Sequence, residues 1–240
     1  MEADEFEVRK QELISECTVP PQVFERVMPR LEQFMAPFVE RLFRKEQVEH
    51  ANMFVQGLLS SLERKNAESI AYLFGQERMP LQHFLGISEW DDKPLREELA
   101  RQIGQQLGEA GGVIVFDPSA FPKSGNNSVG VKRQWCGRLG KIENCQVGVY
   151  IGYASSREHA LVDMRLYLPL EWAKDWKRRK QAGIPKEIRY RTRHELCLEM
   201  LAEHGEQLPH QWITGDDEMG RPYWFRQRLD LLGEQYLLAV

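Results

Sequence analysis

The sequence of 240 residues contains an acidic side chain in a setting that suits metal and phosphate chemistry. The apolar run at residues 113–116 follows Gly112 and is rich in β-branched residues, which predicts a buried strand, and this strand ends on Asp117. A polar stretch without acidic residues then extends from Pro118 to Ile142. A carboxylate at the mouth of a buried strand, beside a basic loop, suits a site that holds a divalent cation and receives a phosphate. The alternative is that Asp117 caps a turn before Pro118, and the local sequence does not separate the two interpretations.

Two basic segments stand out although the net charge of the chain is −4. Residues 123–141 hold five basic and no acidic side chains, and residues 171–195 hold nine basic against four acidic ones. Binding to a phosphate backbone depends on such local patches and not on total charge. The alternative for the second segment is a solvated helix face, and Trp135 in the first is either a base-stacking residue or a core anchor. The predicted DNA contacts are Lys123, Lys132, Arg133, Arg138, Lys141, Lys177, Arg178 and Arg179.

The composition is that of an ordinary soluble protein, with 42% hydrophobic and 28% charged residues. No apolar run approaches the roughly 20 residues needed to cross a bilayer, and residues 1–16 are acidic where a signal peptide is basic and then apolar. We therefore expect a cytoplasmic protein without a membrane partner. The cysteines Cys17, Cys136, Cys145 and Cys197 match neither a CxxC pair nor zinc spacing, which favours reduced, partly buried thiols.

The first part of the chain has helical spacing throughout. Apolar positions predict a helix from Val23 to Phe38, a long helix at about residues 45–74 and a short helical turn at 81–85. Either Asp91 or Asp92 then caps a helix that extends to about residue 107. The glycine-rich break at residues 108–112 is the clearest in the sequence. We place a domain boundary there, so that residues 1–108 form a helical domain.

The second part of the chain changes to strands first and helices afterwards. Strands are predicted at residues 113–116, 144–153 and 160–168, and a basic helix follows at 171–181. Thr192 and Glu195 form a capping-box pattern before a helix that ends near His204. A strand at 212–214 then enters an acidic turn with Asp216, and a helix at 223–232 and a strand at 236–240 complete the pattern.

The order of three strands, helices, strand, helix and strand is that of a ribonuclease H-like core. In that core the first strand pairs with the fourth, which would bring Asp117 and Asp216 together at the ends of neighbouring strands. The expected fold class is therefore α+β, with an N-terminal all-helical domain followed by a partial ribonuclease H-like mixed sheet with helices at residues 109–240.

Several ordered sequence blocks carry a more specific resemblance. They are GLLSSLERKNAESIA at 57–71, LQHFL at 81–85, SVGVKRQWCGRLGKIENCQVGVYIGYAS at 128–155, RLYLPLEW at 165–172, AGIP at 182–185, and the stretch from WITGDD at 212–217 to YLLAV at 236–240. With these blocks the chain resembles the insertion-sequence DDE transposases, also called DDE superfamily endonucleases. Met219 departs from the aromatic residue expected just before Gly220.

The resemblance implies a bacterial, nucleoid-associated transposase that binds double-stranded transposon-end and target DNA and catalyses cleavage and strand transfer. It implies that Asp117 and Asp216 are the first two catalytic acids and ligands of Mg²⁺ or Mn²⁺, with Asp217 as the alternative second acid. Asp117 would contact both of two ions and Asp216 one of them. The helical domain would bind transposon ends or a partner, and the resemblance is compatible with a homodimer.

The resemblance also implies a third acid, a glutamate on a helix after the fifth strand. The sequence reaches Val240 on that strand, Glu218 and Glu234 are too close to Asp216, and Asp163 precedes it. We therefore expect a catalytic core that is incomplete at its C-terminus, with little or no activity by itself. The alternative function is a non-catalytic remnant that binds DNA or a full-length partner.

Overall fold

The computed structural model describes residues 26–240, and the chain divides into two compact units, Met1–Pro94 and Leu95–Val240. The predicted boundary at Gly108 lies one helix later than this division. Helix α6 (Lys93–Gln106) accounts for the difference, because it packs Ala100 and Ile103 into the core of the second unit. The predicted start of the first helix at Val23, and also Cys17, lie outside the described residues.

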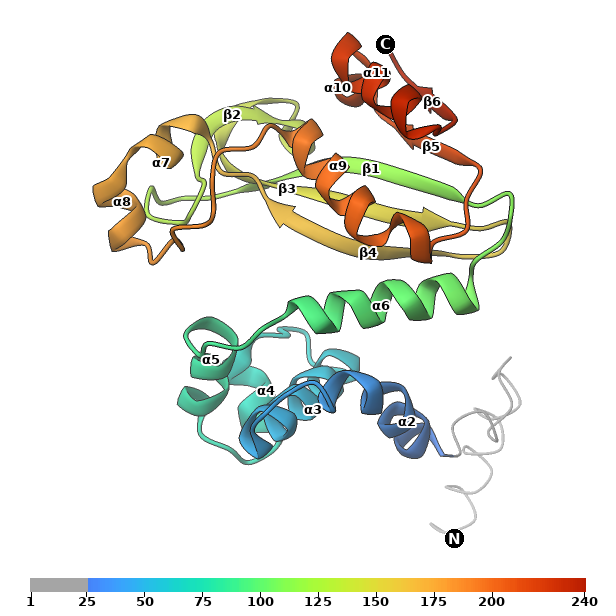
Figure 1. Ribbon diagram of the computed structural model, residues 1–240. Helices are drawn as coiled ribbons and strands as arrows, with labels where there is room; N and C mark the ends of the chain where they lie inside the picture. Colours follow the sequence, from blue (N-terminus) through green and yellow to red (C-terminus); the bar gives the residue numbers. More distant parts are fainter. Residues whose placement is uncertain (1–25) are drawn as a thin grey trace, which may run out of the picture. The chain divides into compact units, whose positions relative to one another are not determined.

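The first unit is helical over its described residues. It contains α2 (Val27–Val39), α3 (Lys45–Leu59), α4 (Ala67–Leu73) and α5 (Arg78–Gly86), which appear in blue to green in Figure 1. Its core consists of the buried side chains Ile70, Ala71, Leu81 and Phe84.

The single long helix predicted at residues 45–74 is wrong, because the segment between α3 and α4 leaves the helical path. Ser60 Oγ donates to the Gly57 carbonyl at 2.7 Å and accepts from the Leu62 amide at 3.3 Å, which ends α3. Asn66 then caps α4 by accepting a hydrogen bond from the Ser69 amide at 2.9 Å. Side chains of this type compete with the helical backbone for hydrogen bonds, so they terminate helices.

The second unit contains a mixed six-stranded sheet. Its long strand β3 (Lys141–Ala154) pairs antiparallel on one edge with β1 (Val113–Pro122), and on the other edge with β2 (Lys132–Cys136) and β4 (His159–Leu166). On its far side β1 pairs in parallel with β5 (Trp212–Gly215), and β5 pairs in parallel with β6 (Tyr236–Leu238). The predicted parallel pairing of the first and fourth predicted strands is confirmed, and the sheet has the strand order expected of a ribonuclease H-like core.

Two predictions about the first strands are wrong. Strand β1 does not end at Asp117 but continues to Pro122, and β2 lies within the predicted loop. Beyond Phe116, β1 pairs with β3 and no longer with β5, so Pro118 and Pro122 lie in an edge-like part of the strand. Proline is tolerated at such positions because its missing amide donor is not needed there.

The helices of the second unit follow the predicted order, with an additional short helix, α10, where an acidic turn was predicted. They are α6, α7 (Leu170–Lys174), α8 (Trp176–Gln181), α9 (Arg193–His204), α10 (Asp217–Gly220) and α11 (Tyr223–Leu232). The basic helix predicted at 171–181 is divided at Asp175, whose side chain caps α8 by accepting from the Arg178 amide. The predicted capping box of Thr192 and Glu195 at the start of α9 is confirmed.

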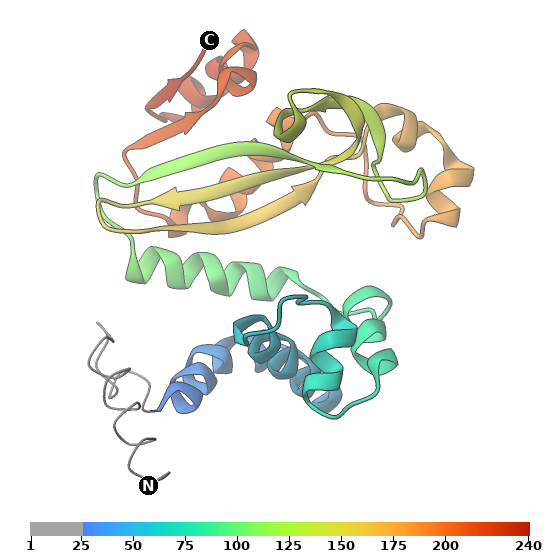
Figure 2. The same ribbon diagram turned by 180° about the vertical axis from the view of Figure 1, so that it is seen from behind.

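The two faces of the sheet differ in their cover. Ile114 and Phe116 of β1 are buried in a core shared with α9, which crosses the sheet in Figure 1. Strand side chains alternate between faces, so Val115 and Asp117 point to the opposite side. In the view from behind, no helix of residues 95–240 lies in front of β1, β3 and β4 (Figure 2). Asp117 is therefore on the open face of the sheet within this unit.

Candidate metal centre

Asp117 and Asp216 lie at matching positions on neighbouring strands. The parallel register of β1 and β5 ends with the pair Phe116 and Gly215, and each acid is the next residue along its strand. Neighbouring strands are about 4.8 Å apart, so the backbone of Asp117 within β1 and that of Asp216 just after β5 lie about one strand spacing from each other. The sheet thus brings the two predicted acids together.

The Asp117 carboxylate is exposed and has a polar neighbourhood on β1 and β3. Its Oδ2 accepts a hydrogen bond from Ser119 Oγ at 3.2 Å. Tyr150 is its cross-strand partner on β3, and the pKa of the Tyr150 phenol is raised by burial and then by the nearby negative charge of Asp117. The sequence pattern did not single out Tyr150, because its place beside Asp117 depends on the pairing register of two strands.

A hollow of about 400 Å³ opens beside this acid on the same face. Asp117 and Tyr150 are among the residues that contribute polar groups to it, with Ser119 and His159, whereas its apolar lining includes Val115, Phe121 and Leu161. The candidate centre therefore has space for a ligand next to an exposed carboxylate.

The Asp216 carboxylate caps the short helix α10. Its Oδ1 accepts from the Met219 amide at 3.2 Å, and the side chain is exposed. The two acids that follow it have cationic partners, because Asp217 pairs with Arg221 and Glu218 forms a two-pronged pair with Arg193 at 2.7 Å. Asp216 thus differs from its two acidic neighbours in having no basic partner within residues 26–240.

Asp117 likewise forms no ion pair with the residues that the structure describes. Two adjacent, exposed carboxylates without a basic partner are a donor set that fits a hard divalent cation. Ligation by oxygen alone favours Mg²⁺ or Mn²⁺ over zinc. The residues present therefore fit the predicted type of ion.

A second acidic group satisfies metal-ligand spacing but is already saturated. Asp163, Glu203 and His204 place one potential ligand atom each within 4.8 Å of one another. The fully buried Asp163 carboxylate, however, accepts from Arg96 Nη1 at 2.9 Å and from Arg165 Nη1 at 2.6 Å, and its Oδ2 lies 2.8 Å from His204 Nε2. A cation would have to displace these donors. We interpret the group as an ion-pair network that joins α6 and α9 to β4.

Several residues that were predicted to contact DNA instead form contacts with other parts of the chain. Arg178 lies 3.5 Å from the centre of the Trp172 ring and donates to the Asn126 carbonyl, and Arg179 donates to the carbonyls of Pro185 and Ile188. Ion pairs hold three more predicted contacts: Lys132 with Glu171 at 2.5 Å, and Arg133 and Lys141 with Glu143 at 3.8 and 3.2 Å.

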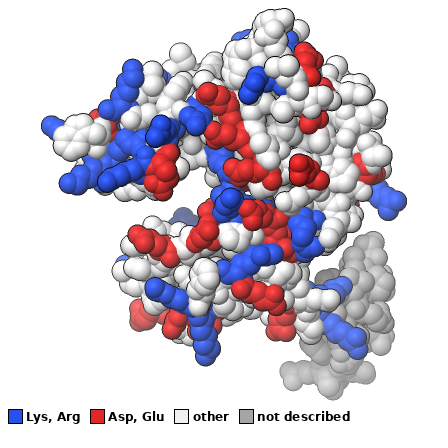
Figure 3. All heavy atoms as spheres, in the orientation of Figure 1, with Lys and Arg blue, Asp and Glu red and all other residues white. Residues whose placement is uncertain are grey.

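The remaining predicted contacts, Lys123, Arg138 and Lys177, form no ion pair with residues 26–240. Figure 3 shows Lys and Arg side chains gathered over α7 and α8, the region that contains Lys177. Trp135 on β2 is 58% exposed, so it is not a core anchor. Its stacking on DNA bases stays a prediction.

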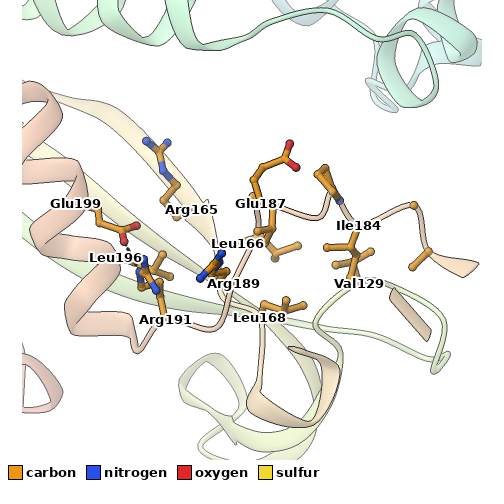
Figure 4. Close-up of a pocket in the computed structure, with 14 residues that line it drawn as sticks. Val129, Arg165, Leu166, Leu168, Ile184, Glu187, Arg189, Arg191, Leu196 and Glu199 are labelled. Atoms are coloured by element: carbon orange, nitrogen blue, oxygen red, sulfur yellow. Dashed lines mark hydrogen bonds and ion pairs between the residues drawn. The ribbon is translucent and has the colours of Figure 1, made fainter. Parts of the chain in front are cut away.

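A separate hollow of about 450 Å³ shares no lining residue with the one beside Asp117. Figure 4 shows the apolar side chains of Leu166, Leu168 and Ile184 that line it, together with charged side chains such as Arg165 and Glu187. Arg191 in this hollow pairs with Glu199 at 2.5 Å. Because the walls come from four separate segments of the chain, no sequence pattern pointed to this hollow.

The cysteines within the described residues behave as predicted. Cys136, Cys145 and Cys197 are free and buried. Burial raises the pKa of the Cys197 and Cys145 thiols, which keeps them protonated and unreactive. No helix within residues 26–240 is long and apolar enough to span a membrane.

Comparisons with known proteins agree on one family. Residues 37–240 match the family model described as DDE superfamily endonuclease. The chain is 33% identical over 147 residues to the "Probable transposase for insertion sequence element IS701" of Microchaete diplosiphon. This alignment covers 60% of the chain and 36% of the relative, so the chain spans about a third of that protein's length.

Solved structures with some similarity include the "Mos1 transposase paired-end complex with left transposon end" and the "Crystal structure of the Mos1 Strand Transfer Complex". Both are 12% identical to the chain, with a TM-score of 0.26. The alignments cover 95% of the chain and 71% and 70% of the solved chains. A TM-score this low supports no inference from these structures.

Proposed function

The chain belongs to the DDE superfamily endonucleases, and on this premise we propose that it carries out the phosphodiester cleavage and strand transfer of an insertion-sequence transposase. The observation that supports this proposal most directly is the parallel pairing of β1 with β5, in which the residues just before Asp117 and Asp216 are partners. The expected substrates are double-stranded transposon ends and target DNA, handled on the bacterial nucleoid by a homodimer.

In this proposal Asp117 and Asp216 are the acids that hold Mg²⁺ or Mn²⁺. Bound divalent ions would supply an activated attacking oxygen and stabilise the leaving oxygen of the scissile phosphate. Asp117, in the middle of β1 on the open face, and Asp216, just after β5, would be the two residues that hold the ions. Asp217 is the weaker candidate for the second acid because Arg221 already neutralises it.

The proposal requires a third carboxylate, and the other nearby acids are poorly suited to the role. Glu218 is paired with Arg193, Glu234 with His210 at 3.0 Å, and Asp163 is buried in its own network. We propose that a glutamate outside residues 26–240 completes the site.

DNA would approach over the basic residues that remain available. Lys123, Arg138 and Lys177 are the strongest candidates for phosphate contacts, since they have no acidic partner among the described residues. The others contribute to a positive surface while they also hold the loops between β1 and β2 and around α8.

The test is cleavage and strand transfer on transposon-end DNA with Mg²⁺. The 240-residue chain is expected to show neither reaction, whereas a version extended through the next helical glutamate should show both. In the extended version Asp117→Asn and Asp216→Asn should abolish both reactions, while the matched control Asp217→Asn should retain them. Activity of the 240-residue chain would contradict the need for a third acid, and full activity of Asp216→Asn would contradict its role.

A further inference from the structure

We propose that Arg193 and His194, at the start of α9, are positioning residues that hold the Asp216 turn in place for metal binding. The inference rests on the proposed function, because it assumes that Asp216 is a metal ligand. It concerns two residues that do not reach the metal centre themselves but grip the segment that carries it.

The Arg193 guanidinium group joins the turn to strand β2. Its Nη1 donates to both carboxylate oxygens of Glu218 at 2.7 Å, and its Nη2 donates to Gln134 Oε1 on β2 at 3.2 Å. The guanidinium also lies 5.0 Å from the centre of the Tyr167 ring. The Arg193 side chain is 17% exposed, so this pair is shielded from water more than a surface ion pair is.

His194 binds the backbone of the same turn. Its Nε2 lies 2.9 Å from the Glu218 carbonyl oxygen, and its ring packs edge-on against Phe225 and Trp224 of α11. Two consecutive residues of α9 therefore hold the side chain and the carbonyl of Glu218.

The turn needs such support because it is short and bears little structure of its own. Helix α10 has four residues, and it is capped by a hydrogen bond from the Met219 amide to Asp216 Oδ1. A helix of one turn is unstable without tertiary contacts. The buried Met219 side chain, 3.7 Å from Cys197 Sγ, supplies one of these contacts to α9.

Helix α9, which carries Arg193 and His194, is itself firmly held in the structure. Its N-terminus is closed by the capping box of Thr192 and Glu195, and Leu196, Cys197 and Met200 are buried in the core under the sheet. Displacement of the turn would move the Asp216 carboxylate relative to Asp117, which is fixed by the β1 ladder. Groups that orient a ligand in this way typically change metal affinity 10- to 100-fold when they are removed.

The test removes the ion pair between Arg193 and Glu218 without changing the net charge. The full 240-residue chain is titrated with Mn²⁺, and free Mn²⁺ is measured by electron paramagnetic resonance. The variant Arg193→Ala/Glu218→Ala should bind Mn²⁺ about tenfold more weakly than the wild type. The matched control Arg191→Ala/Glu199→Ala deletes an ion pair of the same kind, near the start of the same helix, and should bind as the wild type does.

Hydrogen exchange of the peptide that covers α10 gives a second measurement that needs no metal. Its amides should exchange faster in the Arg193→Ala/Glu218→Ala variant and not in the control. Arg193→Lys keeps the charge but loses the guanidinium group that contacts Glu218 and Gln134 together. It should show an intermediate loss of Mn²⁺ affinity. This variant decides the matter if the double variant does not fold.

The outcomes separate the inference from the proposed function. If both double variants bind Mn²⁺ as tightly as the wild type and the amides of α10 exchange at the wild-type rate, the inference is overturned. The proposed function is unaffected by that result. If the Arg193→Lys variant alone is available, unchanged affinity overturns it as well. Faster exchange at α10 in a protein whose wild type binds no Mn²⁺ supports the role of Arg193 and contradicts metal binding by Asp117 and Asp216 without a third acid.

Tighter Mn²⁺ binding by Arg193→Ala alone would also overturn the inference. That result would mean that Arg193 competes with a cation for Glu218, so that Glu218 is itself a ligand.

Discussion

Asp117 and Asp216 each stand one residue beyond the Phe116–Gly215 pair, the last pair that joins β1 to β5 in parallel register. The two acids are far apart in the sequence, and the parallel ladder places the backbone positions that carry them on neighbouring strands. The ladder therefore sets where the two backbones meet, whereas the orientation of the Asp216 side chain also depends on the turn that follows β5.

Repulsion between the carboxylates of the two acids should lower the stability of the metal-free protein. Replacement of one of two adjacent carboxylates relieves like-charge repulsion when no metal is bound. Asp117→Asn should therefore keep or raise the melting temperature without metal, and Mn²⁺ should stabilise it much less than the wild type. Asp216→Asn should behave in the same way, since asparagine also serves as a helix cap. The measurement is differential scanning calorimetry with and without Mn²⁺, and a marked loss of stability in the metal-free variants would contradict the like-charge argument.

DNA binding should depend on the basic residues that have no acidic partner. Each phosphate contact that is lost should reduce the slope of log K against log salt by nearly one unit. Lys123→Ala, Arg138→Ala and Lys177→Ala should each show this reduction in fluorescence anisotropy titrations with duplex DNA. Binding that is independent of salt would leave these residues as ordinary solvated surface.

Arg179 offers a contrast, because its guanidinium group closes the loop after α8. Arg179→Ala should lower the melting temperature, as two carbonyl groups lose their donor. The matched comparison is Lys180→Ala, a neighbouring basic residue for which the structure shows no such contact within residues 26–240. Equal melting temperatures for the two variants would show that the Arg179 contacts do not stabilise the loop.

The buried network around Asp163 should make a large contribution to stability. Asp163→Ala removes the shared acceptor of Arg96, Arg165 and His204, and breaking a buried ion pair in this way costs about 3–5 kcal/mol. Urea unfolding at pH 7 measures the change. Lys132→Ala, which breaks the exposed pair with Glu171, is the control and should have little effect. A loss for Asp163→Ala that is no larger than the control would contradict the structural role of the network.

Tyr167 should make the protein sensitive to alkali. Burial, followed by the neighbouring Tyr190, raises the pKa of its phenol from 10 to about 12. A group whose pKa is higher in the folded state contributes stability that is complete below the unfolded pKa and is lost as pH rises through the folded value. The loss should therefore fall between about pH 10 and 12.

Tyr167→Phe removes this contribution. The difference in urea midpoint between pH 9 and pH 11 should be smaller in Tyr167→Phe than in the wild type. Tyr72→Phe, at an exposed tyrosine, should leave that difference unchanged. An identical alkaline loss in the wild type and Tyr167→Phe would show that Tyr167 is not the group responsible.

The sequence by itself determined the features that depend on neighbouring residues. The β-branched run before Asp117 and the apolar run before Asp216 predicted a strand leading to each of these acids. Thr192 with Glu195 predicted the start of α9. Each of these signals is local, because strand alternation and helix capping involve residues a few positions apart. The strand and helix order was enough to predict the parallel pairing of β1 with β5.

Only the tertiary structure decided which charged groups remain available. The sequence left Asp216 and Asp217 as alternatives, and it did not distinguish Lys177 from Arg178 and Arg179. Arg221 pairs with Asp217 and not with Asp216, whereas Trp172 and the loop carbonyls contact Arg178 and Arg179. An ion pair or hydrogen bond forms only when two groups come within about 3 to 4 Å, and chain folding brings together residues that are far apart in sequence. A pattern of charges along the chain therefore identifies candidates, while the fold selects those that are free to bind a cation or a phosphate.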